Sequence, residues 1–240
     1  MNCYPRRRIA GRQGVLFSFV ALGAAIVIVG GCGLVGNTGS AERPRFVAVL
    51  IDETESFAKD WDAMLRAVGL VANRLGPGGG MVVIGIDDEG FQPDDVRIDV
   101  RFLDPSPLKS RIDARRLAQE IGALKRRTPK RPLTDVLGAI RHAAYFVNRY
   151  PHVDPVIVAF SDMRQTPRMP TAADASGLSF PVGTTVNCYF VDATGWQDWR
   201  KTVQNWQELL TNAGASISAE SFHQKAETTV ELNRLFPRTY

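Results

Sequence analysis

Runs of strand-forming residues alternate with amphipathic segments along most of this chain. Nearly continuous apolar runs predict strands at residues 45–51, 81–86, 155–161 and 184–191. Apolar residues at the helical period predict helices at 61–75, 111–127, 133–150, 196–214 and 226–236. Strands that are apolar on both faces and separated by helices form a mostly parallel sheet covered on both sides. The sequence therefore predicts a doubly wound α/β fold.

Two further segments have weaker strand patterns. Residues 96–103 alternate strictly between apolar and polar side chains, which predicts a half-exposed edge strand. Residues 216–222 follow Gly214 and predict a last short strand. Ligands of such folds bind beyond the carboxyl ends of the parallel strands. The polar residues that follow the strands are therefore the first place to look for a functional site.

The N-terminus has the pattern of an export signal. Four arginines precede a segment that carries no charge from Gln13 to Cys32. Its end, IVGGC, resembles the lipobox of bacterial lipoproteins, in which Cys32 would carry the lipid. The apolar run is also nearly long enough to span a bilayer, so an uncleaved anchor is the alternative. We expect a signal or anchor over residues 1–32, a flexible tether over 33–44 and an α/β domain over 45–240 that lies outside the cytoplasm.

The charge balance and the cysteine positions argue against a nucleic-acid partner, an internal disulfide and a reactive thiol. Four of the 29 basic residues and none of the acidic residues lie before Cys32, which leaves 25 basic and 25 acidic residues in the exported part. This balance gives no electrostatic support to a nucleic-acid partner. Cys188 is the one cysteine in the domain, so no internal disulfide is expected, and its apolar surroundings predict an inert buried thiol.

Oxygen-bearing side chains follow two of the predicted strands. Asp52, Thr54 and Ser56 come after the first strand and Asp162 after a later one, while Thr134 begins a predicted helix. Alternate spacing places residues 52, 54 and 56 on one side of an extended turn, so Glu53 and Glu55 should point elsewhere. Such a donor set favours Mg²⁺ or a similar hard cation. Few carboxylates leave the cation under-neutralised, which favours an external carboxylate as a further ligand.

The segment Asp52-Glu53-Thr54-Glu55-Ser56 resembles the D-x-[ST]-x-S motif of von Willebrand factor type A domains. The metal-ion-dependent adhesion site of that family also takes a threonine from a second loop and an aspartate after a later strand, and Thr134 and Asp162 stand in the matching order. The resemblance covers roughly residues 45–220. It implies a non-catalytic module that binds a carboxylate of a protein or envelope partner through Mg²⁺, Mn²⁺ or Ca²⁺. Thr54 replaces the usual serine, and Met163 stands where glycine commonly follows the aspartate.

Two alternatives remain for the same residues. LIDETES also looks like the first motif of haloacid dehalogenase-type phosphatases, with Asp52 as the nucleophile and Asp87-Asp88 as the acidic pair. The order opposes it, since the serine or threonine and the lysine of that family should precede the acidic pair. Asp87, Asp88 and Glu89 are more simply a solvated strand end. The other alternative is a structural domain whose metal site no longer functions.

The remaining polar and aromatic features have mainly structural interpretations. A basic run precedes Thr134, and we interpret it as a solvated loop that complements a helix C-terminus or as a rim that steers an acidic partner. It comprises Lys125, Arg126, Arg127, Lys130 and Arg131. The three histidines are scattered and are expected to be structural or exposed; they are His142, His152 and His223.

An aromatic stripe lies on the predicted helix over residues 196–214. It consists of Trp196, Trp199, Val203, Trp206 and Leu210. Helical spacing of this kind is typical of a core-facing side. Exposed indoles there would instead indicate a protein-docking patch.

Overall fold

A computed structural model describes residues 43–237, with the exception of 89, 128, 130 and 192–198. The predicted signal or anchor, its Cys32 and most of the tether lie outside the described residues, as do Glu89, Lys130 and Trp196. Among the residues that are described, no helix combines the length and apolarity needed to cross a membrane.

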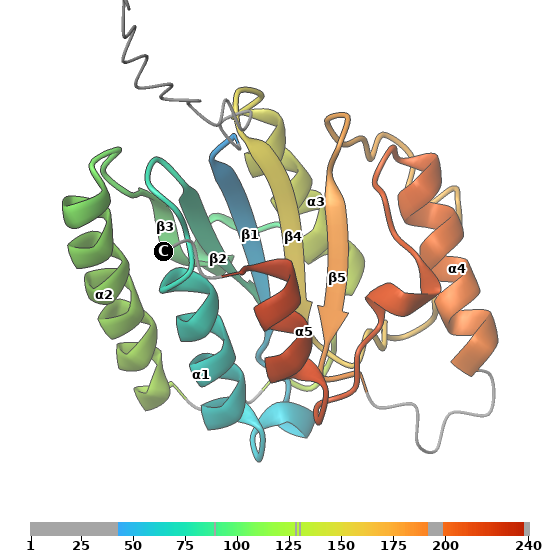
Figure 1. The fold of residues 1–240 in the computed structure, drawn as a ribbon. Coiled ribbons are helices and arrows are strands. Elements are labelled where there is room, and N and C mark those ends of the chain that lie inside the picture. The colour runs from blue at the N-terminus through green and yellow to red at the C-terminus, as the bar shows by residue number, and fades with distance from the viewer. Residues whose placement is uncertain (1–42, 89, 128, 130, 192–198, 238–240) are drawn as a thin grey trace, which may run out of the picture. The chain divides into compact units, whose positions relative to one another are not determined.

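Within the described residues, five strands form one sheet in the order β3-β2-β1-β4-β5 (Figure 1). They are β1 (Arg45–Asp52), β2 (Gly80–Ile86), β3 (Val96–Phe102), β4 (Asp154–Phe160) and β5 (Thr185–Tyr189). The pairs β1–β2, β1–β4 and β4–β5 are parallel, whereas β3 runs antiparallel to β2. Three of the four strands that were expected to be apolar on both faces, β1, β2 and β4, lie at the centre, whereas β5 lies at one edge. The mostly parallel sheet confirms the predicted fold class.

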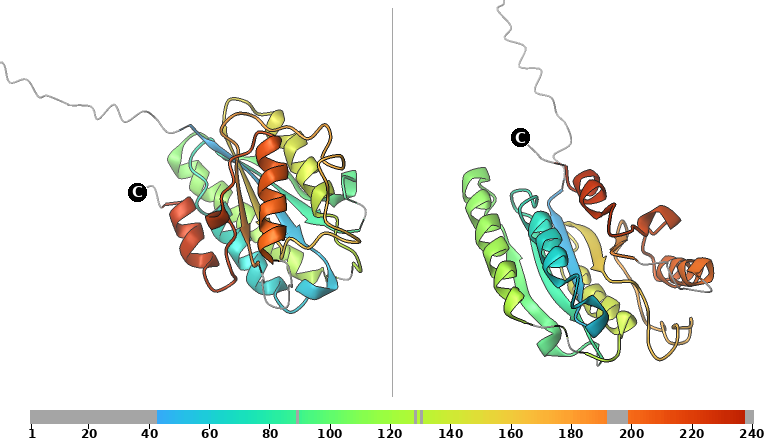
Figure 2. Two further views of the ribbon diagram at one scale, coloured as in Figure 1. Left: turned by 90° about the vertical axis from the view of Figure 1, so that its right-hand side faces the viewer. Right: turned by 90° about the horizontal axis from the view of Figure 1, so that it is seen from below.

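Helices cover both faces of the sheet (Figures 1 and 2). One face carries α1 (Trp61–Ala72), α2 (Pro107–Ala123) and α5 (Thr228–Leu235), and the other carries α3 (Val136–Asn148) and α4 (Trp199–Asn212). Successive residues of β1 alternate between the two cores, since Phe46, Ala48 and Leu50 pack on the α3 side. Val47, Val49 and Ile51 pack on the α1 side. Every one of these β1 side chains is fully buried, which explains the uninterrupted apolar run.

Short 3₁₀ helices occupy several connections, namely Glu55–Phe57, Pro93–Asp95, Leu124–Arg126 and Ala219–Ser221. The last of these contradicts the strand predicted at 216–222. Ser218 and Ser221 form a capping box there, which turns the chain. Instead of a strand, isolated parallel bridges join Thr185 to Ser216 and Cys188 to Phe222 beside β5.

The edge strand β3 contains two bulges against β2. Ile84 pairs with Val96 and Val83 with Ile98, so Arg97 is an extra residue, and a second irregularity follows between Val83 and Met81. The Arg97 side chain crosses β2 at Gly85, where an added Cβ would lie 2.7 Å from the guanidinium Nη2. Glycine at this position therefore lets the guanidinium approach the carboxyl end of β1.

Candidate cation site

Asp52, Thr54 and Ser56 form a compact oxygen cluster where β1 ends. The Asp52 carboxylate is fully buried. Its Oδ1 accepts hydrogen bonds from the Thr54 amide, at 3.0 Å, and from the Thr54 hydroxyl, at 2.6 Å. The hydroxyl oxygens of Thr54 and Ser56 are 2.9 Å apart. The three alternate residues thus face the same side, as their spacing predicts.

The loop after β4 supplies the second part of the cluster. Register places Ile51 of β1 beside Phe160 of β4, so the residues that follow these strands are neighbours. Ser161 donates a hydrogen bond of 2.7 Å to Asp52 Oδ2. Asp162 lies close enough to raise the pKa of Asp52. Its own carboxylate accepts the Arg164 amide at 3.0 Å and lies 3.5 Å from the exposed Arg164 Nε.

Met163 occupies the position where glycine is common in the motif. Its φ of 62° lies in the left-handed region, which explains the usual glycine. The methionine side chain is fully buried, and its carbonyl accepts a hydrogen bond of 3.1 Å from the buried Trp206 indole. Burial and this bond hold the loop in a conformation that a non-glycine residue seldom adopts.

Thr134 belongs to a third loop that is hydrogen-bonded to the other two. The Thr134 amide donates to Thr166 Oγ1 at 2.7 Å, and the Thr166 amide returns a bond of 3.0 Å to the Thr134 carbonyl. In the same loop, Arg131 forms an isolated bridge with Thr54. The loop ends at Asp135, whose carboxylate caps α3 by accepting the Gly138 amide at 2.9 Å. Thr134 is therefore fixed beside the loop that carries Asp162.

The electrostatics of Asp52 suit a nearby cation. Burial raises the pKa of Asp52 to about 6, against the hydrogen bonds from Thr54 and Ser161, and the charge of Asp162 adds to the rise. Across the described residues, no three His, Cys, Asp or Glu side chains converge as a metal cluster. A cation at this place would consequently depend on hydroxyl oxygens beside two carboxylates, a donor set that suits a hard ion such as Mg²⁺.

No family model and no curated protein matches this sequence. Solved structures do match. A von Willebrand factor type A protein from Catenulispora acidiphila is 13% identical with a TM-score of 0.52, over 81% of this chain and 42% of that one. Proximal thread matrix protein 1 from the mussel byssus is 13% identical with a TM-score of 0.53, over 81% and 48%. The pilus adhesin SpaC from Lactobacillus rhamnosus GG is 14% identical with a TM-score of 0.51, over 82% and 30%. The chain has a von Willebrand factor type A fold.

At this level of identity the likeness concerns the fold alone. The chain also matches less than half the length of each of the three proteins. The fold agrees with the one that the Asp52 to Ser56 motif implied. The sheet brings the loops after β1 and β4 together at the carboxyl ends of these strands, where Ser161 donates a hydrogen bond to Asp52.

A buried ion-pair network lies directly behind the cluster. Glu53 points away from Asp52, as expected, but it is buried and forms hydrogen bonds of 2.7 and 2.8 Å with Arg97. Asp87 is 3.4 Å from the same guanidinium and only 2% exposed, so the prediction of a solvated strand end is wrong for this residue. Asp88 is half-buried and lies 3.4 Å from Arg131. The bulge in β3 places Arg97 where it pairs with Glu53 and Asp87, and this pairing offsets the cost of burying their charges.

Sequence reasoning missed both Arg97 and Ser161. Ser161 had a readable signal, because it is a hydroxyl residue directly after β4 and directly before Asp162. The role of Arg97 depends on a bulge and on Gly85 in the neighbouring strand. Neither produces a local sequence pattern.

The basic run divides into residues with different surroundings. Arg131 lies at the rim of the cluster, where its backbone pairs with Glu53 and its side chain approaches Asp88. Lys125 lies 3.5 Å from Asp62 at the start of α1. Arg126 and Arg127 are exposed at the end of α2. The steering role of these residues stays a prediction.

The remaining structural interpretations agree with the fold. Trp206 and Leu210 are buried in the core, and Trp199 is half-buried, so the stripe on α4 faces inward. Cys188 is fully buried, and burial raises the pKa of its thiol to about 12, which confirms the buried thiol. His223 stacks on Tyr189 with ring centroids 4.9 Å apart.

Proposed function

We propose that this domain, with its von Willebrand factor type A fold, is a non-catalytic binding module. It would hold a divalent cation through Asp52, Thr54, Ser56, Thr134 and Asp162. The observation that carries the proposal is the buried Asp52 carboxylate, which is surrounded by hydroxyl groups and has a second carboxylate nearby. Charges that are buried in this way are normally paired or bound to a metal. Mg²⁺ is the expected ion, and Mn²⁺ or Ca²⁺ could use the same oxygens.

The charges around the cluster support a carboxylate partner. Glu53 and Asp87 are already paired with Arg97, which leaves Asp52 and Asp162 as the acidic groups facing the proposed cation. Ser56 is exposed, so the cluster opens to the surface at this residue. A divalent cation whose other protein ligands are neutral hydroxyls could take an aspartate or glutamate of a partner as a further ligand. The adhesin SpaC, named for a binding role, has a similar fold.

We further propose that the domain lies outside the cytoplasm on a membrane tether. Four arginines before an uncharged apolar segment that ends at Cys32 support an export signal with a lipid-modified cysteine. Residues 33–44 would then join the lipid to β1, which begins at Arg45. The partner would be a protein or another component of a bacterial envelope. The mass of the mature N-terminus tests this part, since an intact leader would contradict cleavage at Cys32.

Titration calorimetry with MgCl₂, MnCl₂ and CaCl₂ tests the cation site. Wild type should bind one divalent ion, and Asp52→Ala should bind none. Glu55→Ala is the matched control, because Glu55 lies in the same loop but is exposed and points away from the cluster. Absence of binding by wild type would overturn the proposal and leave a structural domain. Turnover of para-nitrophenyl phosphate, lost in Asp52→Ala, would favour the phosphatase alternative.

Selection from a random peptide library tests the partner chemistry. Immobilised protein in Mg²⁺ should enrich peptides that share an aspartate or glutamate. Replacing that residue by its amide, or adding EDTA, should abolish binding. Peptides retained equally in Mg²⁺ and EDTA would contradict recognition through the cation.

A further inference from the structure

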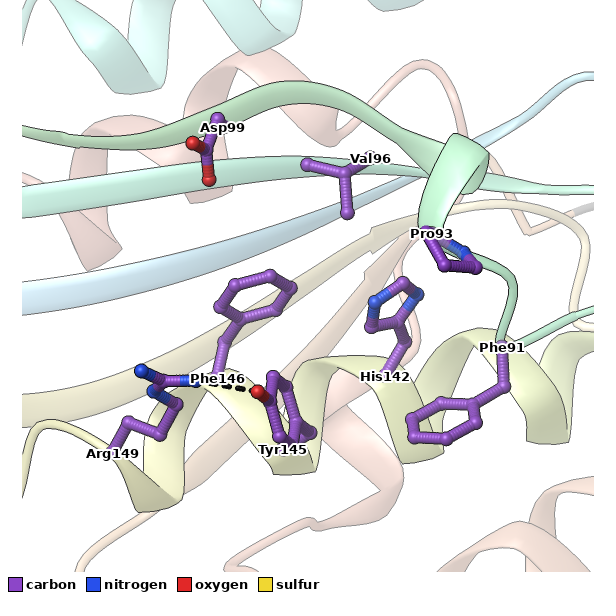
Figure 3. Close-up of a pocket in the computed structure, with 8 residues that line it drawn as sticks. All are labelled: Phe91, Pro93, Val96, Asp99, His142, Tyr145, Phe146 and Arg149. Atoms are coloured by element: carbon purple, nitrogen blue, oxygen red, sulfur yellow. Dashed lines mark hydrogen bonds between the residues drawn. The ribbon is translucent and has the colours of Figure 1, made fainter.

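A pocket of about 510 Å³ lies between the edge strand β3 and helix α3, away from the candidate cation site (Figure 3). It lies where α3, which packs mainly on β1 and β2, leaves β3 only partly covered. The volume falls within the range of about 300–1,000 Å³ that is typical of small-molecule sites. None of the five proposed cation ligands lines it.

Aromatic rings form most of the wall. Phe91 and Tyr145 are 49% and 47% exposed, although aromatic side chains of this size are usually largely buried in a folded domain. The Phe91 ring meets His142 edge to face at 5.1 Å, and His142 stacks on Phe146 at 5.3 Å. Phe91 has a φ of 80°, which is rare for an aromatic residue and is a form of backbone strain that is enriched at functional sites. The backbone thus holds an exposed ring at the mouth of an aromatic pocket.

His142 supplies a polar group without a partner inside the pocket. The residue is only 7% exposed, and among the described residues its buried Nδ1 has no hydrogen-bond partner. Its side chain points from α3 toward β3 across the pocket (Figure 3). Burial lowers the pKa of His142, which favours the neutral ring with one donor and one acceptor. Buried polar atoms are normally satisfied, so a ligand group that reached this nitrogen would supply the bond it lacks.

Opposite charges stand at one end of the pocket. Asp99 and Arg149 lie beyond Phe146, whereas Phe91 and Pro93 lie at the other end (Figure 3). Arg149 donates to the Tyr145 hydroxyl and lies 5.3 Å from the centre of that ring. In the described part of the chain, neither Asp99 nor Arg149 forms an ion pair. The Asp99 carboxylate accepts the Val100 amide at 2.7 Å, but both charged groups are exposed and can still pair with a ligand.

We propose that this pocket binds a small aromatic zwitterion, namely a free aromatic α-amino acid. Its ring would lie among the pocket's aromatic side chains, and its hydroxyl or indole N–H would face His142. Asp99 would bind the ammonium group and Arg149 the carboxylate, a complementarity that an internal residue of a peptide could not provide. This inference goes beyond the proposed cation-dependent function and stands on different residues.

Titration calorimetry of the full chain in matched detergent, with L-tyrosine and L-tryptophan as probes, tests the proposal. At a binding free energy of about −0.3 kcal/mol per non-hydrogen atom, ligands of this size should bind with a dissociation constant of about 1 mM or below. N-acetyl-L-tyrosinamide keeps the ring but lacks both charges, so it should bind at least about tenfold more weakly. L-leucine keeps the charged head but lacks the ring, and it should not bind.

Substitutions separate the pocket from the cation site. Phe91→Ala and Arg149→Gln should each weaken L-tyrosine binding about tenfold, whereas Asp52→Ala should leave it unchanged. The thermal midpoint of each variant reports whether it remains folded. If Arg149→Gln does not remain folded, Asp99→Asn replaces it as the test of the charged contacts. No binding of either amino acid would overturn the proposal, and so would equal binding of the uncharged amide.

Discussion

Replacement of Asp52 by asparagine should stabilise the cation-free protein while it abolishes cation binding. Burial raises the pKa of this carboxyl from its ordinary value of 3.8 to about 6. Because each pH unit between the two values corresponds to about 1.4 kcal/mol, the ionised group lowers the free energy of unfolding by about 3 kcal/mol at pH 7. Asparagine has nearly the same shape and carries no charge, so it removes this term.

Part of this stabilisation is lost because the asparagine amide cannot reproduce all the hydrogen bonds of the carboxylate. Asp52 Oδ2 accepts the Ser161 hydroxyl, and that hydroxyl oxygen already accepts the Met163 amide. An amide NH₂ in place of Oδ2 would disturb this arrangement at a cost of about 1 kcal/mol. The net stabilisation is then about 2 kcal/mol, which raises the unfolding midpoint of a domain of this size by about 4–8 °C.

The assay is thermal unfolding of wild type and Asp52→Asn in EDTA and in Mg²⁺. In EDTA at pH 7 the variant should unfold at the higher temperature. In Mg²⁺ at about 100 times the dissociation constant, wild type should gain about 2.7 kcal/mol and the variant nothing, which reverses the order. Glu55→Gln, with an exposed side chain in the same loop, should follow wild type in both conditions.

The pH dependence of unfolding tests independently whether the ionised Asp52 destabilises the cation-free protein. Between about pH 4 and 6 the folded protein holds a proton on Asp52 that the unfolded chain has lost, so the stability of cation-free wild type falls as pH rises through this interval. The advantage of Asp52→Asn should therefore be complete above about pH 6 and vanish near pH 4. A variant that is less stable than wild type in EDTA at pH 7 would refute the reasoning.

The other predictions concern groups behind and beside the cluster. Arg97→Met removes the ion-pair partner of the buried Glu53 and one partner of the buried Asp87, and it should lower the free energy of unfolding in urea by about 3–5 kcal/mol. Arg101→Met, at an exposed pair, should cost less than about 1 kcal/mol. Trp206→Phe removes the hydrogen bond to the Met163 carbonyl while it keeps an aromatic ring in the core, and calorimetry should show weaker Mg²⁺ binding. Cys188, in a chain whose other two cysteines are replaced by serine, should react with a thiol reagent at pH 8 only after unfolding, because burial raises its pKa to about 12. Rapid reaction of the native thiol would contradict this burial.

The elements of the fold could be predicted because their periodicities are local. The apolar run of β1 and the strict alternation of β3 identified a central strand and an edge strand. The positions of Asp52 and Asp162 followed from the rule that parallel strands end at the same edge. The strand expected at 216–222 failed because its residues make single bridges to β5 and not a continuous ladder.

The partners of the cluster could not be read from the sequence in the same way. The ion pair of Glu53 with Arg97 depends on an extra residue in β3, and hence on a register that only the folded sheet defines. The pocket beside β3 likewise depends on where α3 lies across the strands. Both are consequences of packing between segments that are distant in sequence.

The two edges of the sheet bear on how copies of this protein behave when they are crowded. An open, regular edge would accept a strand from another molecule and begin aggregation. Here β3 is interrupted by two bulges, and the segments around Ser216 and Phe222 bond to the outer side of β5. Strand pairing between neighbouring molecules is thus disfavoured at both edges, which would help a dense layer of these domains to keep its sheets separate.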